Sequence, residues 1–236
     1  MNNFVEIYEN ALSAGTTDYI VNLFNTQKDL TYQGVAGKTK ILDVSKKDST
    51  DLDLMHYGKD KIPINIIKEL EESLTNYLTE YCLKYPLFPN KVDWTTKKNK
   101  EAIKDYLWRY FSVYPFSVLC KKYKKGEQGY HSWHQDRGSQ SPSIHRHLVC
   151  MYYLNDVEKG GETEFYNQKL KVKPKKGSLV IFPATFTHIH KGNIPISNDK
   201  YIMNFWILKG KPIKGDLERM RNKYFLIEPE DNKILN

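Results

Sequence analysis

Histidine residues are concentrated in one part of this sequence. Six of its seven histidines fall between His131 and His190. Within that part, His134 and Asp136 stand two residues apart, and residues at that spacing on an extended strand point to the same face. An imidazole and a carboxylate side by side are two members of the two-histidine, one-carboxylate ligand set that suits non-haem Fe(II). The pair therefore indicates a metal site that takes its third ligand from elsewhere in the chain.

The cysteines do not offer a competing metal site. The chain has three, Cys82, Cys120 and Cys150, and none belongs to a Cys-x-x-Cys pair. An odd number of widely spaced cysteines argues against a disulfide scaffold and against a structural zinc site, and it favours a reducing compartment. We expect Cys150 to be a small buried hydrophobic residue.

Composition and patterning narrow the class of protein. The 236 residues are 40% hydrophobic and 27% charged, which excludes a mainly disordered or collagen-like chain. The first residues lack the basic flank and apolar run of a signal peptide, and no stretch approaches the roughly 18 apolar residues of a membrane span. A cytoplasmic protein without a membrane partner is therefore expected.

The chain is basic, with a formal net charge of +8. Lysine runs such as residues 121–125 are usually solvated faces, although they can also steer an anionic partner toward a protein. The sequence contains no zinc-finger, RNA-recognition or helix-turn-helix pattern, so nucleic acid is not the expected partner.

The first part of the chain is predicted to be helical support. A short strand is expected at residues 4–8, and residues 16–18 offer N-cap chemistry for the helix that follows. Pro63 opens the clearest helix, in which apolar residues recur at three- and four-residue steps until Pro86 ends it. Between the two helices, residues 31–61 are polar and predict a long loop with marginal strands, of the kind that often serves as a lid or binding loop.

From about Ser112 onward, apolar and polar residues alternate and turn residues become frequent. Short strands separated by glycine and proline turns argue for a sandwich or barrel. The expected strands are 130–136, 147–154, 163–166, 168–173, 178–182, 187–190 and 200–208. Two further helices are expected, at about 100–110 and at 216–224.

No linker separates the helical part from the strand-rich part, so we expect one domain over residues 1–236. Its expected divisions are a helical support over 1–111, a β core over 112–210 and a C-terminal tail over 211–236.

The segments around the His134–Asp136 pair follow a familiar order. A Tyr-x-x-Gly turn at Tyr123 precedes the pair, a Gly-Gly-Glu-Thr turn begins at Gly160, and Lys200 follows ten residues after His190. Over roughly residues 117–208 this arrangement resembles the prolyl 4-hydroxylase-like group of Fe(II)/2-oxoglutarate-dependent dioxygenases. The joint match is far more specific than any single segment.

The resemblance implies an α+β protein with a mainly β catalytic core, a double-stranded β-helix or jelly roll with N-terminal supporting helices. It also implies an Fe(II) cofactor, 2-oxoglutarate and O2 as co-substrates, and ascorbate as an accessory reductant. His134, Asp136 and His190 would be the catalytic residues that hold the iron.

The same resemblance implies how 2-oxoglutarate would be bound. Lys200 and Tyr153 would bind its far carboxylate, Tyr123 would contact the same molecule, and Trp206 would pack under the site. Val149 departs from the family pattern, which often has a threonine near the cosubstrate.

Two neighbouring pairs leave a choice of residue. His188 and His190 are both candidates for the third ligand, and the family's spacing to Lys200 selects His190. Adjacent strand residues point to opposite faces, and the family match selects Tyr153 over Tyr152 as the inward one. The remaining histidines of the cluster are expected to be framework or rim residues: His131, His145 and His147.

The substrate implied by the resemblance is a prolyl residue of a peptide or protein, with release of succinate and CO2. Arg137, Trp108 and Arg109 are candidates for substrate contacts.

Two alternative functions stay open. The same chemistry could act on a free amino acid, another protein side chain or a nucleobase, although Lys200 stands where the alkylated-base demethylases have arginine. The chain could instead be a cupin-like binding module without catalysis, which the intact ligand set opposes.

Overall fold

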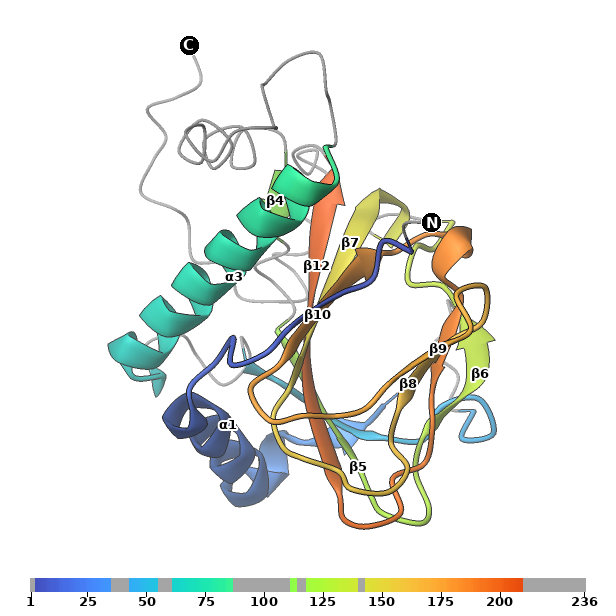
Figure 1. Ribbon diagram of the computed structural model, residues 1–236. Helices are drawn as coiled ribbons and strands as arrows, with labels where there is room; N and C mark the ends of the chain where they lie inside the picture. The colour runs from blue at the N-terminus through green and yellow to red at the C-terminus, as the bar shows by residue number, and fades with distance from the viewer. Residues whose placement is uncertain are drawn as a thin grey trace.

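The computed structural model describes residues 3–34, 43–54, 61–86, 111–113, 118–139 and 143–209. Two antiparallel sheets face each other in it, and two helices lie against the outer side of the larger sheet (Figure 1). This architecture is the double-stranded β-helix, with supporting N-terminal helices, that the sequence predicts. No helix in the described ranges is long and apolar enough to cross a lipid bilayer.

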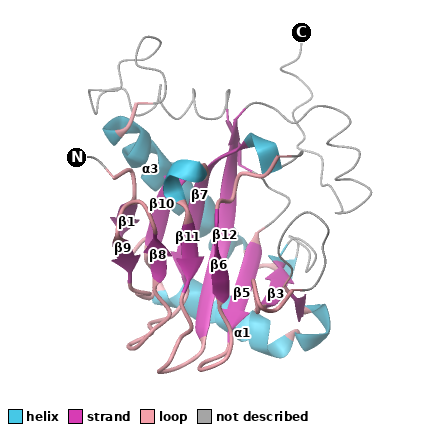
Figure 2. Cartoon of the chain, turned by 90° about the vertical axis from the view of Figure 1, so that its right-hand side faces the viewer, coloured by secondary structure: helices cyan, strands magenta, loops and turns pink. Residues whose placement is uncertain are grey.

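The larger sheet has the strand order β1-β10-β7-β12-β5-β3-β2, with β4 paired to β12. The smaller sheet has the order β6-β11-β8-β9 and lies in front of the larger one in Figure 2. The strands of the larger sheet are β1 (Glu6–Tyr8), β2 (Tyr32–Gln33), β3 (Thr50–Asp53), β4 (Phe111–Val113), β5 (Leu119–Tyr123), β7 (Arg146–Tyr153), β10 (Leu179–Pro183) and β12 (Lys200–Lys209). Those of the smaller sheet are β6 (Tyr130–His134), β8 (Thr163–Phe165), β9 (Leu170–Val172) and β11 (His190–Gly192).

The two main helices are α1 (Ala14–Thr26) and α3 (Ile64–Lys84). Helix α3 begins directly after Pro63, whose fixed φ suits a helix start and whose missing N–H costs nothing there. Its buried residues include Leu74 and Leu78, which stand four residues apart on one face. That face packs on the larger sheet, and the helices thereby hold the sheet from behind.

Strand alternation divides the core into two clusters. On β7, Cys150 and Tyr152 face the helices, whereas Val149, Met151 and Tyr153 face the smaller sheet. Each of these side chains is buried, and burying an apolar side chain of this size contributes about 1.5–3 kcal/mol. The second cluster fills the space between the sheets and forms the floor beneath the histidines.

Three local predictions were wrong. Helix α1 is capped by Ser13, whose Oγ accepts from the Thr16 amide at 3.2 Å, and residues 16–18 are already helical. Phe186–His188 form a 3-10 turn, and β11 begins only at His190. The strand expected at 130–136 ends at His134, because the chain then turns and the Arg137 amide donates to the Ala184 carbonyl at 2.8 Å.

The lysine run at residues 121–125 is not the solvated face expected for it. Lys124 and Lys125 are exposed, but Lys121 is only 5% exposed. It is buried because β5 is an interior strand, flanked by β12 and by β3. Strand β3 comes from the predicted loop at residues 31–61, so part of that loop extends the larger sheet.

Some predictions concern residues outside the described ranges. They are the helices at 100–110 and 216–224, the tail at 211–236, and the substrate candidates Trp108 and Arg109.

Candidate active site

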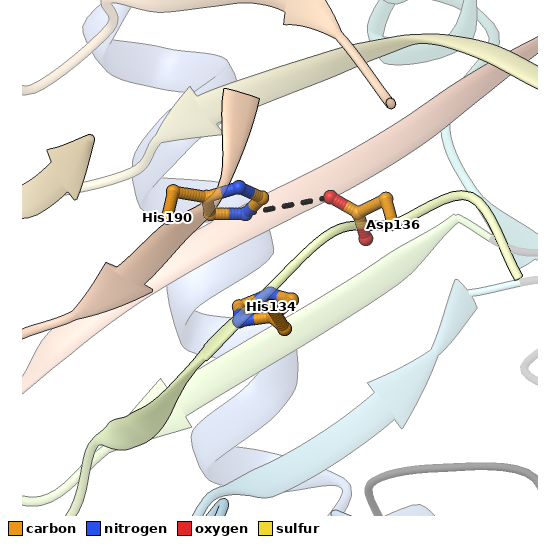
Figure 3. Close-up of side chains that lie close together, drawn as sticks. All are labelled: His134, Asp136 and His190. Carbon is orange, nitrogen blue, oxygen red and sulfur yellow. Dashed lines mark ion pairs between the residues drawn. The ribbon is translucent and has the colours of Figure 1, made fainter. Parts of the chain in front are cut away.

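The smaller sheet brings two histidines together. His134 is the last residue of β6, His190 is the first residue of β11, and the two are direct partners in the antiparallel register. Asp136 lies two residues beyond the end of β6. Ligand atoms of these three residues all lie within 4.8 Å of one another. Figure 3 shows their side chains converging on a single point between the strands.

Both histidine rings are oriented by backbone carbonyls. Nδ1 of His134 is 3.1 Å from the Ser132 carbonyl, and Nδ1 of His190 is 3.0 Å from the His188 carbonyl. Because a carbonyl only accepts, each Nδ1 carries the proton and each Nε2 keeps its lone pair for a metal ion. Nε2 of His190 lies 3.4 Å from Oδ2 of Asp136 (Figure 3).

Aromatic packing fixes the same rings. The ring of Tyr130 stacks on His134 with centroids 3.5 Å apart, and Phe165 and Phe182 surround His190. The side chains are therefore restricted before any ligand binds, which lowers the entropy cost of forming the site.

The charges suit a metal site at neutral pH. Burial, together with the nearby His190, lowers the pKa of His134 to about 3. Burial acts to raise the pKa of Asp136, but attraction to His190, His134 and Arg146 outweighs it, and the pKa is lowered overall. The site thus offers a neutral imidazole and a carboxylate anion, the protonation states that metal binding requires.

A cavity of about 250 Å³ opens beside His134, Asp136 and His190, and a buried lysine lines it. Lys200 on β12 is 2% exposed, and its Nζ donates to the Gly161 carbonyl at 2.7 Å. Its ammonium also lies 5.6 Å from the ring centroid of Tyr123 and 5.4 Å from that of Tyr153. Burial lowers the pKa of Lys200 to about 7. An anion that entered the cavity would restore the favourable charge state of this side chain.

The two tyrosines expected near Lys200 differ in their contacts. Tyr123 lines the cavity. The Tyr153 hydroxyl instead reaches Thr163 Oγ1 at 2.8 Å, with the Val172 carbonyl at 3.3 Å. Thr163 does line the cavity, and its own hydroxyl proton stays available to a ligand. Sequence reasoning did not assign it a role, although it stands in the Gly-Gly-Glu-Thr turn.

The other sequence candidates lie around this centre. Trp206 lines the cavity, whereas Arg137 is exposed and donates from Nε to the Ile144 carbonyl at 2.8 Å. His188 is buried behind His190, with its Nε2 2.9 Å from the Asn3 carbonyl. His145 is exposed and His147 is half-buried, and neither lines the cavity.

Comparison with known proteins agrees with this geometry. Residues 118–208, which contain all three converging side chains, match the family model of the 2OG-Fe(II) oxygenase superfamily. This part of the chain belongs to the 2OG-Fe(II) oxygenase superfamily. No curated protein sequence matches the chain.

Solved structures of the same fold are similar to this oxygenase over a longer part of the chain than residues 118–208. A viral collagen prolyl hydroxylase from Paramecium bursaria Chlorella virus-1 is 21% identical, with a TM-score of 0.56 over 86% of this chain and 95% of its own. A Trichoplax adhaerens prolyl hydroxylase is 16% identical, with a TM-score of 0.62 over 94% and 87%. A Pseudomonas putida prolyl-4-hydroxylase is 13% identical, with a TM-score of 0.55 over 88% and 94%.

The residues of this oxygenase domain fit the superfamily's requirements. Two imidazole Nε2 atoms and one carboxylate could hold Fe(II) on one side and leave the other side open. The Lys200 ammonium lies in the same cavity and could bind the far carboxylate of 2-oxoglutarate. The enzyme is thus a 2-oxoglutarate-dependent dioxygenase, which uses Fe(II), 2-oxoglutarate and O2.

Proposed function

We propose that this dioxygenase hydroxylates prolyl residues of a peptide or protein, with His134, Asp136 and His190 as its iron ligands. One observation supports this assignment most strongly. The three side chains converge at the wall of a cavity that is also lined by the buried ammonium of Lys200. When bound, Fe(II) supplies the redox chemistry that couples conversion of 2-oxoglutarate and O2 into succinate and CO2 to insertion of one oxygen atom into a substrate C–H bond.

The protein's own contribution is binding and orientation. Lys200 and the hydroxyl of Thr163 hold the far carboxylate of 2-oxoglutarate, and the Tyr153 hydroxyl holds Thr163 in place. Tyr123 closes the wall beside Lys200. The cosubstrate is thereby fixed at its distal end, while its keto acid end is directed at the histidines.

The choice of a prolyl substrate rests on the structural relatives. The viral relative is a collagen prolyl hydroxylase, and the Trichoplax relative is described in complex with a peptide fragment of hypoxia inducible factor. We also propose that one domain spans residues 1–236, that ascorbate keeps the iron reduced, and that the protein acts in the cytoplasm.

The proposal is tested by mass spectrometry. Proline-rich peptides and a cell extract are incubated with the enzyme, Fe(II), ascorbate and 2-oxoglutarate. We expect prolyl residues to gain the mass of one oxygen atom, with one succinate formed per hydroxylated residue. Modification of a different residue type would overturn the prolyl assignment while leaving the reaction class intact.

A further inference from the structure

Lys121 is a second buried cation in the active-site cavity. It is 5% exposed and lines the cavity from β5. Within the described ranges, its ammonium has no hydrogen bond and no ion pair, and it lies 5.5 Å from the ring centroid of Trp206. Burial, reinforced by Lys47, lowers its pKa to about 8. An ammonium has three donors, and leaving them unpaired in a buried place is costly unless a ligand completes the site.

The nearby acidic groups already have partners. Asp51 pairs with Lys47 at 2.8 Å and accepts from the Ser49 hydroxyl at 2.7 Å. Asp136 faces His190 and is one of the proposed iron ligands. Both carboxylates attract Lys121 and act to raise its pKa, and Asp51 is its register partner on β3, but among the described residues neither forms an ion pair with it, and burial outweighs their effect.

Two more cations lie near Lys121, and each of them also faces a carboxylate. Lys47 also lines the cavity and is 3% exposed. The guanidinium of Arg146 lies 3.9 Å from the ring centroid of Trp206, the ring that Lys121 also approaches, and donates to the Asp136 carbonyl at 3.1 Å. Three cations and two carboxylates therefore surround this part of the cavity, and the excess positive charge favours an anion there.

The distal carboxylate of 2-oxoglutarate cannot satisfy both buried lysines. Lys200 and Tyr123 are register partners on β12 and β5, and Lys121 is two residues farther along β5, opposite Ile202. The two ammonium groups repel, since Lys121 contributes to the lowered pKa of Lys200. With the distal carboxylate on Lys200 and the other end at the iron, Lys121 still faces the cavity without a directly bonded anion among the described residues.

We infer that Lys121 forms a subsite that binds a carboxylate of the substrate, so that the preferred substrate is an acidic peptide with Asp or Glu close to the hydroxylated residue. This inference rests on the proposed function, in which the substrate is a peptide, and it specifies that this peptide is negatively charged. The chain's net charge of +8 would favour the approach of such a peptide.

The test uses three pools of peptides with a central proline. Their flanking positions carry Asp and Glu in the first pool, Asn and Gln in the second, and Lys and Arg in the third. Binding to the full-length protein loaded with Mn(II) and 2-oxoglutarate is measured directly, and hydroxylation is measured separately with Fe(II). We expect the acidic pool to bind about tenfold more tightly than the amide pool, the effect of one charged hydrogen bond.

Matched variants assign the preference to one side chain. Lys121→Met keeps the length of the side chain and should abolish the preference, whereas Lys121→Arg should retain most of it. Lys124→Met removes an exposed charge from the same lysine run and should leave the preference unchanged. The dissociation constant of 2-oxoglutarate should be the same in Lys121→Met as in the wild type.

The outcomes separate this inference from the proposed function. Equal binding of all three pools, no binding of any pool, or an acidic preference that survives Lys121→Met overturns the inference. Weaker 2-oxoglutarate binding in Lys121→Met also overturns it, because Lys121 would then serve the cosubstrate. Charge-dependent binding without hydroxylation of proline would instead keep the subsite and contradict the prolyl assignment.

Discussion

Nε2 of His190 lies 3.4 Å from Oδ2 of Asp136, although the two residues belong to separate segments of the chain. The antiparallel pairing of β11 with β6 produces this proximity, because it sets His190 opposite His134 and leaves Asp136 just past the strand end. With a backbone carbonyl on each Nδ1, the rings can turn only their Nε2 atoms toward the carboxylate.

Removing a proposed iron ligand should abolish metal binding. In His134→Ala, the cluster loses one of its three donors, and we expect no stoichiometric Fe(II) binding and a loss of succinate formation of at least about 100-fold. Metal content after dialysis and succinate release check this. The exposed His145→Ala is the matched control and should bind iron normally; a His134→Ala protein with full iron content would refute the assignment.

Removing the buried ammonium should weaken 2-oxoglutarate binding selectively. Lys200→Met keeps the bulk of the side chain but loses a charge-assisted hydrogen bond, so we expect the apparent KM for 2-oxoglutarate to rise about 10–100-fold. Steady-state succinate formation at varied 2-oxoglutarate gives this constant. The exposed Lys159→Met should not change it, and an unchanged KM in Lys200→Met would exclude Lys200 from cosubstrate binding.

The lowered pKa of Lys200 predicts proton uptake when 2-oxoglutarate binds. Burial lowers this pKa to about 7, so at pH 8 most of the free protein has Lys200 uncharged. A bound carboxylate raises the pKa again, and the protein must take up as much as about one proton. Affinity should therefore fall as the pH rises above 7.

Calorimetry at pH 8 in buffers of different ionisation enthalpy measures this uptake. The Lys200→Met protein is the control, and it should lack the component of uptake that belongs to the lysine. Proton release on binding, or equal uptake by both proteins, would show that Lys200 is not the titrating group.

Thr163 should contribute both to stability and to 2-oxoglutarate binding, because its hydroxyl accepts from Tyr153 and also lines the cavity. In Thr163→Val the Tyr153 hydroxyl loses its partner at 2.8 Å and keeps only the longer contact of 3.3 Å to the Val172 carbonyl, so we expect part of the roughly 1–3 kcal/mol cost of an unsatisfied buried hydroxyl. We expect a lower free energy of unfolding in urea and a higher KM for 2-oxoglutarate. Thr163→Ser should restore both, whereas a destabilised variant with an unchanged KM would limit Thr163 to a structural role.

Sequence alone predicted much of the larger architecture. Apolar runs bounded by turn residues located β7, β10 and β12, since each of these strands is buried on both faces, by a helix layer and by the smaller sheet. The spacing of His190 to Lys200 was informative because β11 and β12 are consecutive strands of opposite sheets that meet at one cavity. The three proposed iron ligands come together because β11 pairs with β6, which sets His190 opposite His134.

The charged wall of the cavity was not predicted. Lys121 belongs to a run of lysines, and composition alone suggests a solvated face for such a run. Its burial depends on β3, which arrives from a polar segment far earlier in the chain and covers β5. Alternation could have indicated it, since Lys121 and Tyr123 stand two residues apart on one strand and share a face.

The start of the small strand β11 at His190 was also not predicted from the local sequence. Residues 187–190 read as extended, yet the chain makes a 3-10 turn through His188, whose carbonyl then accepts from His190. The turn is stabilised by tertiary contacts, among them the His188 side chain against the Asn3 carbonyl. A local pattern cannot contain that information.

The fate of dioxygen tests the central claim most directly. The enzyme is incubated with Fe(II), ascorbate, 2-oxoglutarate and proline-rich peptides under isotopically labelled O2, and both products are analysed by mass spectrometry. The account predicts one labelled oxygen atom in succinate and one in the hydroxylated peptide, with both products lost in Asp136→Ala. Succinate without the label, or turnover that survives Asp136→Ala, would contradict it.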